Sequence, residues 1–242
     1  MSRIVFQKSY ITIVPSFEKT DTHKHPLMHL FFGKNGCKIT ADGNEIQGNI
    51  ILLDSNVKHI VKEGNGCDFF LLIDPTSVIA EQLIDRYMQK SFYADISRNN
   101  VDVTTDLLNI SDEEIIQIAE NVLSSLGVTT KEIGTKDERI EKIIANIISG
   151  EWLNYSVKKI AEEVFLSESR LTHLFKEEAG ISLKSYILIR KMECAYKFVS
   201  LGGKITQGAQ EGGFSSSAHL AYTCKTLTGV SITNVLNPLP MY

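Results

Sequence analysis

The 242-residue sequence lacks several features that would each point to a particular class of protein. Its apolar runs are short, with 69–73 among the longest, whereas a helix that crosses a bilayer needs about 18 apolar residues or more. No apolar signal-peptide core forms before Gln7 and Lys8. The four cysteines are scattered without a close pair, so neither a disulfide framework nor a cysteine-based zinc site is expected. These absences predict a cytoplasmic protein without a membrane partner.

The sequence also lacks an overall positive charge, since its formal net charge is −4. Residues 1–134 hold 12 Lys and Arg against 18 Asp and Glu, whereas residues 135–242 hold 13 against 11. Only the second part therefore has an electrostatic reason to approach phosphate groups. Any binding to nucleic acid is expected there, with an affinity that falls steeply as the salt concentration rises.

Residues 1–73 have the pattern of short β-strands separated by turns. Strands are predicted at 9–14, 27–32, 38–41, 50–53, 58–61 and 69–73. The turn signals are Asn35-Gly36, Asp42-Gly43-Asn44 and Gly64-Asn65-Gly66. Many short strands with frequent turns predict a small antiparallel barrel or jelly roll over residues 1–73.

From residue 75 onward the apolar spacing becomes helical. A first helix is predicted at about 76–90 and a second at 111–126, where Ser111 and Glu114 match a capping box. Their apolar faces would pack either on the barrel or on a second subunit, so residues 74–130 are interpreted as a helical dimerisation segment. Further helices are predicted at about 137–149, 157–164, 168–178, 182–200, 206–212 and 216–227. The expected fold class is α+β with two domains, the second being an all-α module over residues 131–242.

Residues 157–176 predict two short helices joined by a tight turn. Ala161 is small where two helices must approach closely, and Ser167 can cap the second helix. Leu171, Leu174 and Phe175 give that helix an apolar inner face. Its open side carries Ser169, Arg170, Thr172, His173 and Lys176. A compact unit with a polar second helix is the kind that inserts into the major groove of DNA.

The pattern recurs at residues 205–225. Ala209 corresponds to Ala161, Phe214 to Leu166, Ser215 to Ser167 and Lys225 to Lys176. Two such units joined by a long helix at about 182–200 would lie roughly 34 Å apart on one face of DNA. The alternative for 205–225 is a helix pair with a structural role alone.

The stretch from Leu166 to Tyr186, followed by Arg190, Ala195 and Gly213-Phe214-Ser215, resembles the AraC/XylS family of bacterial regulators. The resemblance covers about residues 137–235. It implies a double helix-turn-helix domain whose third and sixth helices enter adjacent segments of the major groove. The DNA-binding residues that the resemblance implies are Ser169, Arg170, Thr172 and His173 in the first helix-turn-helix and Ser217, Ala218, Ala221 and Tyr222 in the second. Lys176 and Lys225, which occupy corresponding positions in the repeated pattern, are added as DNA-binding candidates.

The second helix-turn-helix departs from the family pattern at several positions. Gly208 and Gly212 replace aliphatic or small side chains, and a glycine inside a helix costs roughly 0.5–1 kcal/mol of stability relative to alanine. Tyr222 stands where an arginine is usual, Cys224 where a phenylalanine is usual, and Ile232 where a proline is usual. The second helix-turn-helix is therefore expected to be looser and less basic, and the first helix-turn-helix to dominate DNA binding.

Four of the six histidines lie in the predicted barrel, at His23, His25, His29 and His59. Their spacing resembles the two cupin motifs, in which His-x-His, a Glu and a later His bind a divalent metal inside a jelly roll. His29 takes the Glu position, while Asp54 and Asn56 stand in for the usual Pro and Gly. Neutral imidazoles suit zinc, nickel, copper or iron, so these four histidines are candidate ligands of one divalent transition metal. The alternatives are an organic effector in a metal-free barrel, or ordinary polar residues at a solvated barrel mouth.

These features predict a DNA-binding transcription regulator that is not an enzyme, with a cupin-like effector-binding barrel. The family resemblance implies an activator that contacts RNA polymerase, responds to a small molecule or a metal, and forms a homodimer. One alternative is a cupin metalloenzyme with a DNA-binding appendage, which requires an open coordination position and has only Asp54 as an acid–base partner near the histidines. A further alternative is an interaction protein that no longer recognises an operator.

Overall fold

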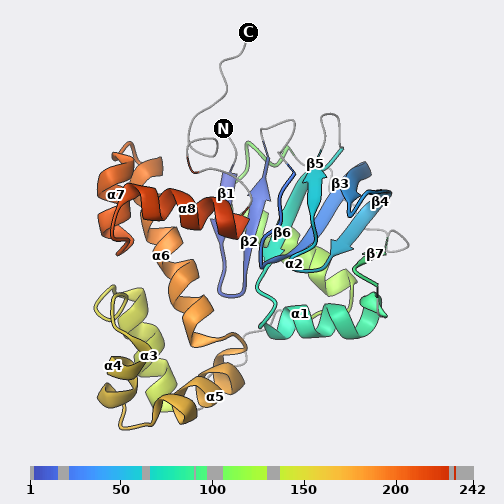
Figure 1. Ribbon diagram of the computed structural model, residues 1–242. Helices are drawn as coiled ribbons and strands as arrows, with labels where there is room; N and C mark the ends of the chain where they lie inside the picture. Colours follow the sequence, from blue (N-terminus) through green and yellow to red (C-terminus); the bar gives the residue numbers. More distant parts are fainter. Residues whose placement is uncertain are drawn as a thin grey trace. The chain divides into compact units, whose positions relative to one another are not determined.

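The computed structural model describes residues 3–15, 22–61, 66–89, 91–96, 106–129, 137–228 and 232 (Figure 1). The chain divides into two compact units. One consists of Met1–Pro75, Ile79–Thr130 and Ala221–Tyr242, and the other of Thr76–Val78 and Lys131–Leu220. The division therefore falls within the last helix, α8 (Ser217–Thr228).

Within the described residues, the strands of the first unit form one antiparallel sheet in the order β1-β2-β6-β3-β4-β7, and β5 pairs with β3. The strands are β1 (Arg3–Phe6), β2 (Tyr10–Val14), β3 (Met28–Ala41), β4 (Asn44–Leu53), β5 (His59–Val61), β6 (Phe69–Ile73) and β7 (Tyr93–Asp95). The long strand β3 is central because its first half pairs with both β4 and β6, and its second half with both β4 and β5.

The predicted strands are all found, with three differences. The predictions at 27–32 and 38–41 are parts of the single strand β3, and the strand predicted at 50–53 begins at Asn44. Strands β1 and β7 were not predicted. Asn35-Gly36 is not a turn, because it lies within β3, where the pairing with β4 shifts register between Phe32 and Cys37. Gly36 has φ +93° there, which fits a β-bulge. The predicted turn at Asp42-Gly43 is confirmed, with φ +44° and +82° as a type I′ hairpin turn requires.

Two helical segments pack on one face of the sheet (Figure 1). They are α1 (Val78–Leu83), which continues as the π-helical turn η1 (Ile84–Met88), and α2 (Asp112–Ser125). Ala119 and Leu123 of α2 belong to the same buried cluster as Leu30 and Leu71 of the sheet. Of the two expectations for these helices, packing on the sheet is therefore the one observed.

The second unit is helical. Its helices are α3 (Glu138–Ile148), α4 (Val157–Glu163), α5 (Glu168–Ala179), α6 (Leu183–Ser200) and α7 (Ile205–Glu211). These bounds, and those of α8, lie within two residues of the predictions. The side chain of Ser156 caps α4, that of Ser167 caps α5 and that of Ser182 caps α6, each accepting a hydrogen bond from a backbone amide of the first turn. Among the described residues, no helix is both long and apolar enough to cross a membrane.

Candidate nucleic-acid interface and histidine cluster

Helices α4 and α5 form a tightly packed pair. Ile160 and Ala161 of α4, and Leu171 and Phe175 of α5, are all at most 3% exposed. The Oγ of Ser167 accepts the backbone amide of Arg170 at 3.2 Å, so α5 begins where the sequence predicts. The buried apolar stripe fixes which face of α5 is turned away from the other helix.

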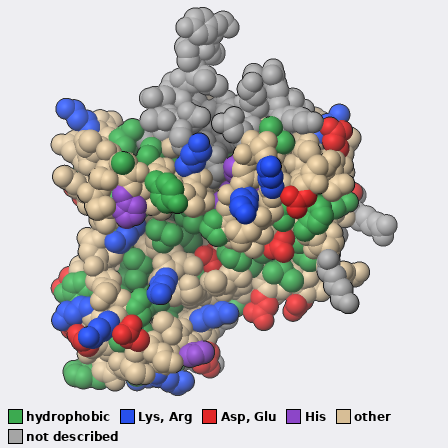
Figure 2. Space-filling model, viewed as in Figure 1, with side chains coloured by type: hydrophobic (Ala, Val, Ile, Leu, Met, Phe, Trp, Pro, Cys, Tyr) green, Lys and Arg blue, Asp and Glu red, His purple; other side chains and the backbone are tan. Residues whose placement is uncertain are grey.

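The opposite face of α5 is polar and open. Of the predicted DNA-binding residues, Ser169, Arg170, His173 and Lys176 are exposed and Thr172 is half-buried. The Thr172 hydroxyl donates to the Ser169 carbonyl at 2.9 Å. Figure 2 shows Lys and Arg side chains over the part of the surface formed by α3, α4 and α5, with Asp and Glu side chains among them.

Gly208 in α7 and Gly212, the C-cap residue of that helix, have a packing role that the helix-propensity argument did not anticipate. A Cβ atom on Gly212 would lie 2.6 Å from the backbone oxygen of Lys191 in α6. A Cβ atom on Gly208 would lie 2.5 Å from a methyl carbon of Val199. Both glycines therefore allow α7 to lie close against α6, and they do not merely loosen the second helix-turn-helix.

Helix α8 begins one residue later than the duplicated pattern implies. The Oγ of Ser216, not of Ser215, accepts the backbone amide of His219 at 3.0 Å. The Oγ of Ser215 instead lies 3.0 Å from Nδ1 of His219. Counted from the capping serine, His219 in α8 takes the position of Arg170 in α5.

This shift identifies an exposed residue that the sequence reasoning missed, His219. Of the predicted residues in α8, Ala218, Tyr222 and Lys225 are exposed, while Ser217 and Ala221 are half-buried. Counting from the cap, Tyr222 corresponds to His173 and Lys225 to Lys176. The Ser215-Ser216-Ser217 run hid the signal, because each of the three serines could have been the cap.

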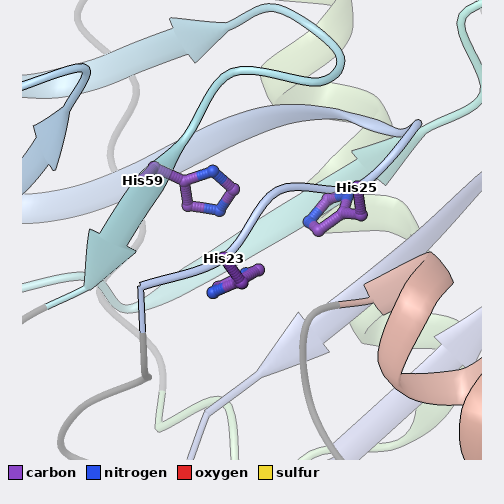
Figure 3. A group of neighbouring side chains, drawn as sticks. All are labelled: His23, His25 and His59. Carbon is purple, nitrogen blue, oxygen red and sulfur yellow. The ribbon is translucent and has the colours of Figure 1, made fainter.

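In the first unit, three histidines converge (Figure 3). His23, His25 and His59 each offer a ring nitrogen, and these atoms all lie within 4.8 Å of one another. The backbones of His23 and His59 exchange two hydrogen bonds, of 3.0 and 2.8 Å, and the His25 carbonyl accepts the Asn56 amide at 2.8 Å. The segment before β3 is thereby held against the segment that leads into β5.

His29 lies beside this group, on β3. Its Nε2 atom is 3.2 Å from Nε2 of His25, and its ring is stacked on that of Phe31 at 4.7 Å between centroids. The structure therefore brings all four predicted histidines together, three of them as the tightest group. Asn56, at the predicted glycine-like position, has φ +60°, a conformation that Asn tolerates better than most residues.

Burial dominates the electrostatics of the cluster. His25, His29 and His59 are each at most 3% exposed. Burial lowers the pKa of His25 to about 3 and that of His59 to about 4, and it holds the pKa of His29 well below the ordinary value. These three imidazoles are therefore neutral at pH 7, the form in which histidine binds metals.

The hydrogen bonds of His59 determine which of its nitrogens can act as a ligand. Its Nδ1 lies 2.8 Å from the Val57 carbonyl oxygen, so Nδ1 carries the proton and donates it. Its Nε2 then bears the lone pair, and this buried atom has no hydrogen-bond partner among the described residues. The Asp54 carboxylate accepts the Ser55 amide at 2.7 Å, which gives Asp54 a role in the local turn.

Residues 160–237 match the family model described as "Helix-turn-helix domain". No curated protein matches the chain. Among solved structures, ToxT from Vibrio cholerae O395 is similar over 99% of this chain and 98% of its own, with 14% identity and a TM-score of 0.48. The C-terminal domain of the response regulator yesN from Fusobacterium nucleatum is similar over 40% of this chain and 97% of its own, with 23% identity and a TM-score of 0.37. The AraC-like transcriptional activator CuxR is similar over 84% of this chain and 78% of its own, with 16% identity and a TM-score of 0.22.

Proposed function

We propose that this chain, a DNA-binding transcription regulator whose residues 160–237 match an AraC-type helix-turn-helix domain, recognises its operator with α5 and α8. The observation that carries the proposal is the division of α5 into two faces. Leu171, Leu174 and Phe175 are buried, while Arg170 and His173 are exposed on the other side of the same helix. A helix of this kind can enter the major groove without exposing its apolar side chains.

Within α5, we assign base contacts to Arg170 and His173. An arginine can donate two hydrogen bonds to a guanine, and a neutral imidazole offers one donor and one acceptor. Lys176, less than one turn beyond His173, is assigned to a phosphate, where a flexible cation positions the protein without reading sequence. Ser169 precedes Arg170 and Thr172 precedes His173. The Thr172 methyl group suits contact with a thymine methyl group because its hydroxyl is bonded to its own helix.

Within α8, the predicted set gains His219. Ala218 and Ala221 suit apolar contacts with thymine methyl groups, and Tyr222 stands 71% exposed in the position that corresponds to His173. Ser217, next to the cap, and Lys225 are assigned to phosphates. Because α8 has one basic side chain, Lys225, where α5 has two, we expect α5 to supply most of the affinity.

The domain assignment proposed from the sequence remains residues 1–73 as a cupin-like effector-binding barrel, 74–130 as a dimerisation segment and 131–242 as the DNA-binding domain. Since the apolar faces of α1 and α2 pack on the sheet, the proposed dimer contact of 74–130 would use their polar faces. The burial of side chains on both faces of the sheet supports the barrel. Phe31 and Leu72, on one face, are as buried as Leu30 and Leu71 on the other face. The effector, a small molecule or a metal, must bind one arrangement of the protein more tightly than another to change its activity. We further propose that the protein is a cytoplasmic activator that forms a homodimer and contacts RNA polymerase.

A cupin metalloenzyme with a DNA-binding appendage is the second candidate, and the histidine cluster favours it. A catalytic centre also needs an acid–base group beside the metal, and Asp54 is engaged in its own turn. Oxygen- or substrate-dependent turnover by the metal-loaded full chain would support this candidate.

Selection of genomic DNA fragments by the purified protein, with and without a chelator, tests the proposed function. The expected result is one enriched sequence motif with two half-sites about one helical turn apart. The doubly substituted Arg170→Ala, Lys176→Ala protein is the control and should enrich no motif. Equal recovery of all sequences by the unsubstituted protein would contradict the proposal.

A further inference from the structure

The histidine cluster holds buried ring nitrogens whose hydrogen bonding is incomplete. Nδ1 of His25, Nδ1 of His29 and Nε2 of His59 are buried without a hydrogen-bond partner among the described residues. An unsatisfied buried polar atom costs roughly 1–3 kcal/mol, so such atoms are rare unless something else binds them. His25 and His59 form, with His23, the group whose ring nitrogens lie within 4.8 Å of one another, and His29 lies beside it.

We propose that His23, His25 and His59 bind one divalent transition-metal ion, and that His29 positions His25 for this role. The inference is independent of the proposed DNA binding, because none of the four histidines belongs to α5 or α8. Three imidazole ligands at about 2.0–2.1 Å suit Zn²⁺, with the fourth tetrahedral position left to water or another small ligand. Tetrahedral ligands at this bond length are about 3.3–3.4 Å apart. The three nitrogens, which lie within 4.8 Å of one another, would move closer together as the ion binds.

The positioning role of His29 follows from the His25–His29 contact. Nε2 of His29 lies 3.2 Å from Nε2 of His25, so one of these two nitrogens donates a hydrogen bond to the other. The ring of His29 is in turn stacked on that of Phe31, at 4.7 Å between centroids. His29 thereby holds the His25 ring in place beside His23 and His59, as the Val57 carbonyl orients the ring of His59.

A metal at this position would join two segments that are distant in the sequence. His23 and His25 precede β3, whereas His59 begins β5, and a pair of backbone hydrogen bonds between His23 and His59 already links them. Metal binding to the folded protein would therefore stabilise the first unit by mass action. The metal would thus act on the arrangement of the unit that we propose receives the signal.

The test uses the full-length protein, stripped of metal with a chelator and titrated with Zn²⁺ in a calorimeter. We expect one ion per chain and a melting temperature that rises with the Zn²⁺ concentration. Co²⁺ should give the visible absorption of a tetrahedral site. A wild-type protein that binds no ion, or that gives an octahedral Co²⁺ spectrum, would overturn the proposal whether or not any variant folds.

Two variants separate the ligands from the positioning residue. Loss of an outer-shell partner lowers metal affinity by roughly 10–100-fold, so His29→Ala should retain the tetrahedral Co²⁺ spectrum with an affinity reduced to that extent. His59→Ala should lose more affinity than His29→Ala and should no longer show the tetrahedral spectrum. The matched control is His173→Ala, exposed on α5, which should bind metal like the wild type. Wild-type affinity in His59→Ala, or loss of the tetrahedral spectrum in His29→Ala, would contradict the assignment.

Discussion

Phe165 and Gly213 occupy the same position in the turns of the two helix-turn-helix repeats. Each directly follows the C-cap residue of the first helix of its repeat, α4 or α7. Both have a left-handed backbone, with φ +55° at Phe165 and +66° at Gly213. Glycine adopts this conformation without steric cost, whereas phenylalanine does not. The Phe165 side chain is also 95% exposed, so packing does not offset the strain.

Replacing Phe165 by glycine should therefore stabilise the second unit. Relief of the left-handed strain contributes about 1–2 kcal/mol, and the greater freedom of glycine in the unfolded chain offsets roughly 0.5–1 kcal/mol of it. Urea unfolding followed by circular dichroism would measure the gain. Phe165→Ala is the control, because it keeps the Cβ atom and should leave the strain in place. A lower midpoint for Phe165→Gly than for Phe165→Ala would contradict the strain argument, because both variants lack the aromatic ring and differ only in the Cβ atom.

Gly212→Ala should destabilise the protein, although alanine is the better helix former. Its Cβ atom would lie 2.6 Å from the backbone oxygen of Lys191 and 2.9 Å from the Cβ of Ala195, so α7 would have to move away from α6. Overpacking of this kind typically costs about 1–3 kcal/mol. Gln210→Ala, at an exposed position of the same helix, should leave the urea midpoint nearly unchanged. Helix propensity alone predicts a gain in stability for Gly212→Ala. The sign of the change in the urea midpoint therefore decides between helix propensity and overpacking.

His173→Ala should weaken binding to the selected operator more than binding to random DNA. Loss of one base contact costs about 1–3 kcal/mol, which corresponds to an affinity roughly 5- to 150-fold lower for the operator. Fluorescence anisotropy with both DNAs at one salt concentration measures the difference. Equal losses on the two DNAs would exclude a base-reading role for His173.

Lys176→Ala should weaken binding to every sequence and reduce the slope of log affinity against log salt by about one. The measurement is a salt titration of the binding constant, with the exposed Lys184 of α6 substituted by alanine for comparison. If the salt slope stays the same in Lys176→Ala, the lysine does not contact a phosphate.

Asp137 should make the stability of the second unit depend on pH in the acid range. It caps α3, and hydrogen bonds from Arg139 lower its pKa to about 2 from the ordinary 3.8. Because the pKa is lowered by folding, the contribution is complete above about pH 4 and is lost as the pH falls toward 2. Asp137→Asn retains a capping oxygen without the charge. The difference in unfolding free energy between wild type and Asp137→Asn should therefore shrink as the pH is lowered, and a difference that grows would contradict this account.

The sequence predicted best those features that depend on neighbouring residues. The capping box of α2 is present as predicted, with the Ser111 hydroxyl and the Glu114 carboxylate each accepting the other residue's backbone amide. The bulge in β3 was mistaken for a turn, because Asn-Gly is a strong local turn signal. In the folded protein that segment continues as a strand, since β3 pairs with other strands on both sides of the bulge. Pairing partners of this kind lie far away in the sequence.

The same distinction applies to the histidines. Their spacing predicted that they would meet, and they do. It could not show that His59 is oriented by the carbonyl of Val57, or that His25 and His29 contact each other through their Nε2 atoms. Although the residues of each pair are close in the sequence, these contacts depend on the backbone path and the side-chain rotamers, and the spacing of residues does not contain that information.

The outward face of α2 has a consequence for subunit assembly. With its apolar side chains committed to the sheet, this helix presents Glu113, Gln117 and Asn121 to solvent. Permanent dimers are usually joined through apolar surfaces that resemble a protein core, whereas polar surfaces give weaker and reversible contacts. Two copies that met through α2 would therefore separate readily at low concentration. Adjacent half-sites on one DNA molecule would raise their local concentration enough to hold them together.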